Sequence, residues 1–459
     1  MGNIEKLQQF SRSSGPTICL MIILLSFILF SSFMALNLKT NIIPDEPAHY
    51  ALSKYFANTI KIPNDSPQTF SLGIYIEQNP VLYYWINGRI INAVRLFVPQ
   101  AADRDLLVIL RMVNVFFSLG TVLAFFLLSR EVIKHPWWQL FPVFLLVNTS
   151  MYVFLSAGVN YDNLTNLLSM LGLYFFVRVF SRDDIFLNSI LWMIFIALAA
   201  LTKYTILPLA LAMGISWLFF LLSNKKDIKS INFKDTKTLI FLFMLIFLFA
   251  WNFSIYGVNI IRYQALLPAC EEILLESQCA LSPLDQRNQE LAINPRMTIK
   301  ESVERGFPNP IIYAADTWIQ NMLLRTFGFI GHKTYFPLNL MIFYSLLFYG
   351  TVLLGMFLFR RSSFLTFNLL GITIFYSLVL LYTNYTSELK YGFIHIALQG
   401  RYIFPVIGLI YVLFTKIVRN IPIQQLRLLF VTFTLGLFAY GGPITIIIKY
   451  QEVFSDWFI

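Results

Sequence analysis

Two adjacent carboxylates and a histidine stand close together near the start of the chain. The segment Pro44–Tyr50 reads Pro-Asp-Glu-Pro-Ala-His-Tyr and follows the first long apolar run. In one interpretation Asp45 or Glu46 is the N-cap of a helix, with Pro47 in its first turn. In another, a carboxylate in partly desolvated surroundings is a general base that takes a proton from an attacking hydroxyl. The interpretations are compatible, so Asp45 and Glu46 are candidate catalytic residues and His49 is a candidate substrate contact.

Two further acidic groups belong to short polar stretches of the chain. Asp162 ends the stretch Ser156–Asp162, which is too short to form a domain. Glu77 begins a Glu-Gln-Asn-Pro-Val-Leu-Tyr-Tyr sequence that ends in Tyr83 and Tyr84. A helix cap is the structural alternative for both acids. We expect Asp162 to lie near the first carboxylate pair as the third candidate catalytic residue, with Glu77, Tyr83 and Tyr84 as candidate substrate contacts.

Cations at the ends of apolar runs complement these acids. Lys203 follows one run, Arg401 and Tyr402 open another, and His332 and Lys333 precede a third. Such cations often anchor a helix by extending their charged ends toward the membrane surface. They also suit a phosphate group, because Arg offers paired donors and Lys a point charge. These five residues are therefore candidate substrate-binding residues.

Membrane-spanning helices are the elements that must position these side chains. The chain is 57% hydrophobic and 13% charged. This composition excludes a soluble fold, because soluble domains carry about twice that charged fraction. Crossing a bilayer takes about 17 to 25 apolar residues, in a helix that satisfies its own hydrogen bonds. About eleven such runs predict an all-α polytopic membrane protein: Thr17–Leu38, Leu106–Leu128, Trp137–Ser156, Leu164–Phe180, Ile185–Leu201, Tyr204–Leu222, Thr238–Tyr256, Phe336–Phe359, Phe364–Tyr382, Tyr402–Ile417 and Leu428–Ile448.

The distribution of Lys and Arg predicts the orientation of these spans. One alternating set of connections holds the basic residues Lys6, Arg12, Arg130, Lys134, Arg178, Arg182, Lys225, Lys226, Lys229, Lys234, Lys237, Arg360, Arg361, Lys416, Arg419 and Arg427. We expect this set and the N-terminus to be cytoplasmic, so the long segments 39–105 and 257–335 face outward. The net charge of +10 is partly this topology signal. Scattered cations without a recognition module do not indicate nucleic-acid binding.

The two long segments also divide the chain. We expect an N-terminal transmembrane module, a long outer loop and a set of C-terminal spans at residues 1–256, 257–335 and 336–459. Within the first outer loop, Pro47–Ile60 and Pro80–Val98 have the one-sided apolar pattern of helices that lie in the membrane interface. Cys270 and Cys279 share the second outer loop, and we predict a disulfide between them. Two free thiols are the alternative.

Several chemistries find no support in the sequence. There is no Walker A loop, no Rossmann glycine pattern and no Cys or His cluster with zinc spacing. The Asp-Arg-Asp sequence at 103–105 is similar to a metal-nucleotide motif, but it is predicted on the outer side and is interpreted as the polar edge of a span. Arg111 is the clearest charge inside a span, whereas a transporter would need more ionisable groups near the midplane.

Four segments occur here in an order that resembles the GT-C superfamily of membrane glycosyltransferases. They are the Asp-Glu pair after the first span, the Glu-x-x-Pro-x-x-Tyr-Tyr sequence, Asp162 between the third and fourth spans, and the Gln-Gly-Arg-Tyr sequence at 399–402. The likeness is to aminoarabinose transferases, protein mannosyltransferases and membrane proteins of polysaccharide gene clusters. Relatives often carry His-Pro-Pro before the Tyr-Tyr pair, where this chain has Asn79, Pro80 and Val81.

The resemblance implies a GT-C-like fold and specific roles. Asp45 would be the catalytic base, Glu46, Glu77 and Asp162 would line the acceptor and sugar pocket, and Arg401 with Lys203 would hold a lipid phosphate. The implied reaction moves a monosaccharide from a polyprenyl-phosphate donor to a glycan or glycolipid acceptor, an O-antigen-like glycan above all, at the periplasmic face of a bacterial inner membrane. No cofactor follows from the resemblance, and a divalent metal is left open.

Two rival functions fit the same topology. A polysaccharide polymerase would depend on outer-face Arg residues rather than on paired carboxylates. A glycolipid flippase or exporter is not an enzyme and would work without Asp45. Substitution of Asp45 by Asn therefore separates a carboxylate-dependent transferase, which should not tolerate it, from a flippase, which should.

Overall fold

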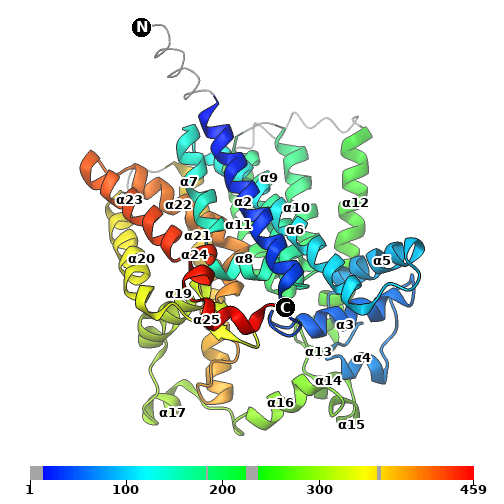
Figure 1. The fold of residues 1–459 in the computed structure, drawn as a ribbon. Helices are drawn as coiled ribbons and strands as arrows, with labels where there is room; N and C mark the ends of the chain where they lie inside the picture. The colour runs from blue at the N-terminus through cyan, green and yellow to red at the C-terminus, as the bar shows by residue number, and fades with distance from the viewer. Residues whose placement is uncertain (1–13, 182–183, 224–235, 359–362) are drawn as a thin grey trace.

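The computed structural model describes residues 14–181, 184–223, 236–358 and 363–459, which form a bundle of long apolar helices. Shorter elements gather at one end of the bundle, at the bottom of Figure 1. We call this end, which carries residues 39–105 and 264–337, the loop face. Part of the basic set that predicts the orientation lies outside the described residues: Lys6, Arg12, Arg182, Lys225, Lys226, Lys229, Lys234, Arg360 and Arg361.

Eight helices of the described ranges are long and apolar enough to cross a membrane. They are built on α2 (Gly15–Asn37), α6 (Asp103–Val132), α9 (Tyr161–Phe180), α11 (Leu207–Ser223), α12 (Thr236–Asn252), α20 (Leu338–Leu358), α21 (Phe364–Tyr391) and α22 (Phe404–Arg419). Two bent helix pairs raise the number of candidate spans to ten. The shorter apolar helix α10 (Ile185–Ala200) occupies the remaining predicted run. The protein is thus an all-α polytopic membrane protein, and eleven crossings stay a prediction.

The two bent pairs replace continuous spans that the sequence predicts. Helices α7 (Pro136–Val147) and α8 (Ser150–Ser156) meet at 69°, and α23 (Gln424–Tyr440) and α24 (Pro443–Lys449) meet at 51°. The breaks touch each other, because the Ser150 hydroxyl donates a 3.2 Å hydrogen bond to the carbonyl of Gly441. A polar side chain at one break thus satisfies a backbone carbonyl at the other break.

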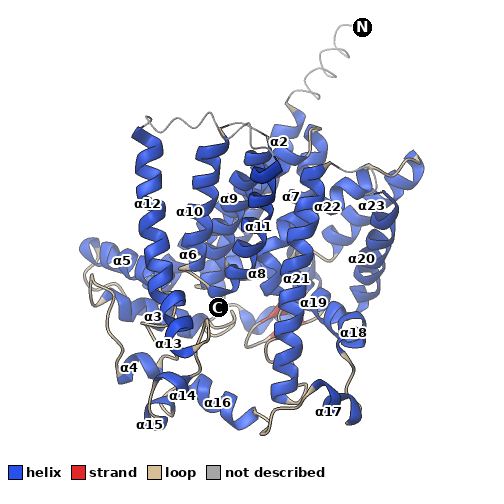
Figure 2. Cartoon of the chain, turned by 180° about the vertical axis from the view of Figure 1, so that it is seen from behind, coloured by secondary structure: helices blue, strands red, loops and turns tan. Residues whose placement is uncertain are grey.

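Two helices continue past their predicted ends toward the loop face. Helix α21 runs to Tyr391 rather than Tyr382, and Figure 2 shows its end standing below the bundle among the loop-face elements. Helix α12 continues through a π-helical turn, η3 (Phe253–Gly257), into α13 (Val258–Tyr263). The second outer segment, expected from residue 257, therefore begins inside a helix. The apolar pattern alone did not reveal these extensions, because polar residues such as Asn259, Asn384 and Glu388 interrupt it there.

The remaining elements cover the loop face. They are α3 (Glu46–Ala57), α4 (Pro67–Ser71), α5 (Leu82–Phe97), α14 (Cys270–Ile273), α15 (Glu276–Cys279), α16 (Pro283–Leu291), α17 (Ile299–Glu304), α18 (Pro310–Ile312), the π-helix η4 (Tyr313–Trp318), α19 (Ile319–Phe327), the hairpin strands β1 (Phe329–Ile330) and β2 (Thr334–Tyr335), α25 (Gln451–Phe454) and the 3₁₀ turn η7 (Ser455–Trp457). Helices α3 and α5 occupy the two predicted interfacial stretches and pack on each other. Cys270 and Cys279 form a disulfide with Cα atoms 5.7 Å apart.

Helix α22 is the innermost of the long helices. It packs against α6, α7, α9, α20, α21 and α23, and most of its side chains are buried. Because it is apolar on nearly all sides, a central position is the one that hides it from both water and lipid. Its loop-face end continues the 3₁₀ turn η6 (Gly400–Ile403), which brings Arg401 to the middle of the loop face.

Candidate active site at the loop face

Asp45 occupies the N-cap position of α3 but does not cap the helix. Its side chain makes no capping hydrogen bond, and its φ of 59° lies in the left-handed region that side chains rarely adopt. The carboxylate instead accepts a 2.6 Å hydrogen bond from the Arg401 guanidinium. The Asp45 side chain is 55% exposed, whereas that of Arg401 is 4% exposed. A strained backbone thus directs a solvent-accessible carboxylate onto a buried cation.

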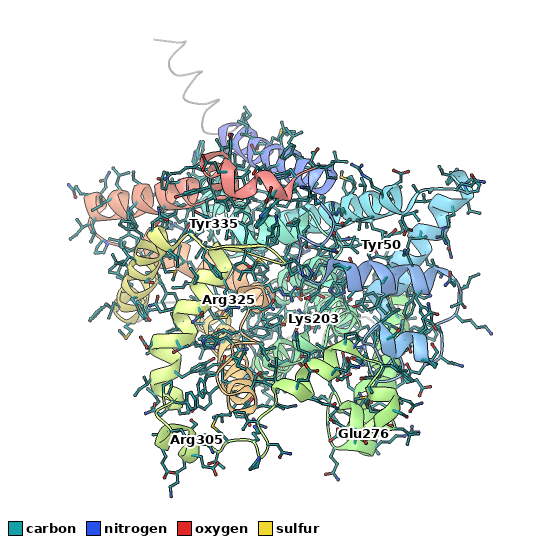
Figure 3. All side chains as sticks on the ribbon, turned by 60° about the horizontal axis from the view of Figure 1, so that its bottom comes forward. Tyr50, Lys203, Glu276, Arg305, Arg325 and Tyr335 are labelled. Atoms are coloured by element: carbon teal, nitrogen blue, oxygen red, sulfur yellow. A yellow bond between two sulfur atoms is a disulfide. The ribbon has the colours of Figure 1, made fainter. Side chains whose placement is uncertain are left out.

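Four side chains form an alternating row of charges that starts at Asp45. Arg401 Nε lies 3.7 Å from Asp162 Oδ2, and Lys203 Nζ donates a 2.5 Å hydrogen bond to Asp162 Oδ1. Arg401, Asp162 and Lys203 are buried, so the row leads from the surface into the bundle. Figure 3 shows Lys203 near the centre of the loop face. Two carboxylates and two cations balance, which makes burial of the charges tolerable.

Helix starts hold each member of this row. Asp162 lies in the first turn of α9, directly after the N-cap Asn160. The Asn160 side chain accepts a hydrogen bond from the Asp162 backbone N–H at 2.9 Å and donates one to the carbonyl of Pro44 at 3.1 Å. Lys203 precedes the 3₁₀ turn η1 (Tyr204–Ile206), which leads into α11. The positive ends of these helices add to a field that favours an anion at this face.

Glu46 points away from this row into a closed ion pair with Arg111. Arg111 donates to the two carboxylate oxygens at 2.8 and 2.6 Å, and both side chains are 2% exposed. The same guanidinium donates to the carbonyl of Leu38 at 2.7 Å. The backbone N–H of Val159 donates to Glu46 at 3.0 Å. The pair therefore ties the end of α2 to the start of α3 and supports Asp45, whereas the sequence suggested a pocket role for Glu46.

His49 is buried within the site one turn after Asp45. Its Nδ1 lies 2.9 Å from the hydroxyl of Tyr84, and its ring meets that of Tyr161 edge-on at 4.5 Å. Burial lowers the pKa of His49 to about 4, and the negative charge of Asp45 offsets this effect only in part. Tyr83 is buried beside it and donates to Asn114 at 3.0 Å. His49 is thus a neutral group inside the site at neutral pH.

Opposing effects set the proton affinity of Asp45. Burial raises the pKa of this carboxyl, but the positive charge of Arg401 and the hydrogen bond from it prevail, and the net pKa lies below the ordinary value. Asp45 is therefore ionised while it is paired with Arg401. A ligand that draws Arg401 away would raise its affinity for a proton.

The other predicted site residues fall into two groups. The Tyr402 ring lies 4.7 Å from Lys203 Nζ and belongs to the site. Glu77 is exposed, and no contact described for the ranges above joins it to the charge row. His332 donates its backbone N–H to the carbonyl of Ile42 at 3.2 Å, and Lys333 lies 3.4 Å from Asp456 at the surface. His332 and Lys333 thus serve the hairpin that supports the segment before Asp45.

Sequence reasoning missed two features of the site. Tyr161, whose ring lies 4.6 Å from Lys203 Nζ, immediately precedes Asp162 in a stretch already singled out. Glu388 is the second feature, a buried carboxylate at the end of α21 that accepts hydrogen bonds from the side chain and backbone N–H of His395 at 2.8 and 3.1 Å. The feature of the sequence that could have identified Glu388 is a charged residue shortly after the apolar run Phe364–Tyr382. Glu388 fixes the connection that leads to Arg401.

The described ranges contain no group of three or more His, Cys, Asp or Glu side chains placed to hold a metal ion. Asp45 and Asp162 are instead joined by the Arg401 guanidinium, which occupies the position between them. The residues present thus form an ion-pair site whose cations come from the chain itself.

Comparison with solved structures defines the fold class. The oligosaccharyltransferase of Archaeoglobus fulgidus, solved with a tethered acceptor peptide, matches with a TM-score of 0.50 and 13% identity over 97% of this chain and 56% of that chain. ArnT from Cupriavidus metallidurans in the apo state gives a TM-score of 0.49 and 12% identity over 88% of this chain and 60% of that chain. ArnT bound to undecaprenyl phosphate gives 0.48 and 11% identity over 89% and 60%.

These likenesses concern the fold. The chain shares the multi-pass helical fold of the Archaeoglobus fulgidus oligosaccharyltransferase. It spans less than two thirds of the length of each of these structures. No protein-family model matches the sequence, and no curated protein is significantly similar to it.

Proposed function

We propose that this protein is a glycosyltransferase that moves a monosaccharide from a polyprenyl-phosphate donor to a hydroxyl of a surface glycan of the O-antigen type. The loop face would lie on the periplasmic side of a bacterial inner membrane, with the N-terminus in the cytoplasm. The observation that carries the proposal is the row Asp45–Arg401–Asp162–Lys203, which opens to solvent at a carboxylate. The GT-C fold supports it, because an oligosaccharyltransferase shares that fold.

The charges suit a phosphosugar at the membrane surface. Arg401 and Lys203 are buried cations at the loop-face ends of apolar helices, where a lipid phosphate would reach them while its isoprenoid tail lies along the bundle. Their present partners are carboxylates, so a phosphate would compete for the same donors. Tyr161 and Tyr402 flank Lys203 and exclude water from it. Such preorganised cations stabilise charge that grows on a departing phosphate.

Asp45 is the proposed base. Arg401 turns toward the phosphate of the bound donor, which raises the proton affinity of Asp45. The acceptor hydroxyl gives its proton to Asp45 while its oxygen bonds to the anomeric carbon, and the bond from that carbon to the phosphate oxygen breaks. Polyprenyl phosphate departs with the bonding electrons, and a single displacement inverts the configuration.

The test is sugar transfer in reconstituted membranes with polyprenyl-phosphate monosaccharides and a surface-glycan acceptor. Asp45→Asn should lower the transfer rate about 10²- to 10⁴-fold, the usual contribution of a general base. Asp103→Asn is the matched control, because Asp103 is an exposed loop-face acid that pairs with Lys54 at 2.8 Å. This variant should transfer sugar at the wild-type rate. Equal activity of Asp45→Asn and Asp103→Asn would remove Asp45 as the base.

The rival functions predict other results. A flippase would move glycolipid across the bilayer with either variant and would transfer no sugar. A polymerase would elongate a glycan in an Arg401-dependent manner and tolerate Asp45→Asn.

A further inference from the structure

His49 lies among all the charged groups of the site. Its side chain is buried on α3, and the groups that face it come from every element packed around it: Asp45 before α3, Tyr83 and Tyr84 on α5, Tyr161 and Asp162 on α9, Lys203 before η1, and Arg401 in η6. The row described above does not use this imidazole. A buried imidazole surrounded by charged groups therefore calls for a separate explanation.

Two tautomers of the neutral His49 ring are compatible with its hydrogen bond to Tyr84. Burial raises the pKa of the Tyr84 hydroxyl well above its usual range, so the hydroxyl keeps its proton. His49 Nδ1 is its one hydrogen-bond partner among the described residues. Each tautomer leaves one buried hydrogen without an acceptor in the described ranges of the chain, either Nε2–H of the ring or the hydroxyl hydrogen of Tyr84. We assign the tautomer in which Nδ1 accepts from Tyr84 and the proton of the neutral ring is on Nε2, because Nε2 belongs to the residue that the charged groups of the site surround and a ligand bound there can accept from it.

The Nε2–H group that follows from this assignment has no acceptor. Nε2 is fully buried and makes no hydrogen bond within the described part of the chain. Two polar atoms of the charge row share this condition, Asp162 Oδ2 and Arg401 Nε. Those two atoms face each other as an ion pair at 3.7 Å, whereas His49 Nε2 has no partner of any kind in the residues that the structure describes. Buried polar groups are satisfied in almost all proteins, so this nitrogen beside a loosely paired guanidinium points to a polar ligand.

We propose that His49, as a neutral imidazole, donates its Nε2–H to an oxygen of the bound phosphosugar. The inference rests on the proposed function and adds a third donor beside Arg401 and Lys203. A neutral donor is suited to this position, because a third cation in the buried site would face Arg401 and Lys203 and would be repelled by both. Tyr84 acts as the positioning residue, since its hydroxyl holds the ring in the tautomer that donates.

Activity of three variants tests the proposal. His49→Phe keeps an aromatic ring of similar volume but has no hydrogen-bond donor. It should lower kcat/KM about 10- to 100-fold, which is the usual effect of losing one hydrogen bond to a charged group. His49→Gln keeps an N–H near the site and should recover part of the loss, and Tyr84→Phe should lose activity by leaving the tautomer free. His135→Gln is the control, because His135 is exposed at the opposite end of the bundle. Wild-type kcat/KM in folded His49→Phe overturns the proposal.

Binding of undecaprenyl phosphate without a sugar separates the two oxygens that Nε2–H could reach. Weaker binding to His49→Phe assigns the hydrogen bond to the phosphate. Unchanged binding together with a lower transfer rate assigns it to the sugar. Unchanged binding together with an unchanged rate contradicts both assignments.

A spectroscopic readout keeps this inference distinct from the proposed function. The chain has four histidines, so ¹⁵N-histidine spectra of wild type and His49→Gln identify the His49 signal by difference. We expect a neutral ring protonated at Nε2 in wild type and a mixture of tautomers in Tyr84→Phe. A ring protonated at Nδ1 overturns the inference. Absence of transfer by wild type with any donor overturns the proposed function, and the tautomer then still tests the Tyr84 assignment.

Discussion

Asp45 and Glu46 are chain neighbours with opposite environments. Asp45 is half exposed and pairs with a cation that a ligand can reach, whereas Glu46 is enclosed by Arg111 and the backbone of Val159. The two side chains point in different directions because of the backbone at the start of α3. Asp45 has a left-handed conformation there, which turns its own carboxylate outward and the carboxylate of Glu46 inward. Glu46 therefore has a structural role in holding the start of α3, and Asp45 has the proposed catalytic role.

This division predicts different effects of two similar substitutions. Glu46→Gln leaves the Arg111 guanidinium buried without its counter-charge, so the free energy of unfolding should fall by about 3–5 kcal/mol. Asp45→Asn should lower it by less, because the Asp45 side chain is 55% exposed and the buried Arg401 keeps Asp162 as a counter-charge at 3.7 Å. Thermal unfolding in detergent measures both. Similar melting temperatures for the two variants would contradict the structural role of Glu46.

The pKa of His49 predicts a pH dependence of stability. The unfolded chain takes up a proton on this ring below pH 6.5, while the folded chain does so only near pH 4. Stability from the neutral ring is therefore complete above pH 6.5 and is lost as the pH falls toward 4, by about 2 kcal/mol at pH 5. Wild type should lose more stability than His49→Gln between pH 7 and 5. Parallel losses in detergent melting curves would show that His49 is not held neutral.

Residue types predicted most of the site, but not its pairs. Asp45, Asp162, Lys203 and Arg401 were candidates because charge next to apolar runs needs a reason, and the structure brings these four together. The Glu46–Arg111 pair was not predictable, because two residues 65 positions apart meet only through the packing of α2, α3 and α6.

At the scale of elements, the segment that carries Asp45 is held on two sides. The C-terminal segment forms a β-bridge from Phe458 to Leu38 at the end of α2. The tip of the β1–β2 hairpin packs on the carbonyl of Ile42, and a Cβ added at Gly331 would lie 1.9 Å from that oxygen. Backbone rather than side chain limits this contact, so only glycine fits it.

Gly331→Ala should therefore displace the segment before Asp45. A shift of about 1 Å in a catalytic group can cost about 10²-fold in rate, and we expect a loss of that order in the sugar-transfer assay. Gly436→Ala is the matched control, because a Cβ there meets no atom within 4 Å. If both variants transfer sugar equally well, the hairpin does not position Asp45.

Apolar runs predicted where the long helices lie, because the bilayer sets their length and polarity. The breaks between α7 and α8 and between α23 and α24 were not predicted, since each break is stabilised by the other. Helices α3 and α5 were predicted because a one-sided apolar pattern of that length is typical of a helix with one buried face. The extensions of α12 and α21 contain polar residues and carry no such signal.

For the whole molecule, the C-terminus and the charge row share one face. Ile459 donates its backbone N–H to the carbonyl of Asn37 at 2.9 Å, close to the start of α3. If the basic connections are cytoplasmic, this face is periplasmic. A phosphatase fused after Ile459, active only outside the cytoplasm, should be active, and the same reporter placed between residues 224 and 235 should be inactive. The reverse pattern would place the proposed reaction in the cytoplasm.

The pair of Asp45 with Arg401 joins residues 356 positions apart. During synthesis the first helices enter the membrane long before residue 401 leaves the ribosome. Until then Asp45 has no cation from η6, and Asp162 is paired with Lys203 alone. The site can form only when α22 enters the centre of the bundle. The row is therefore complete only after the last helices have been inserted and packed.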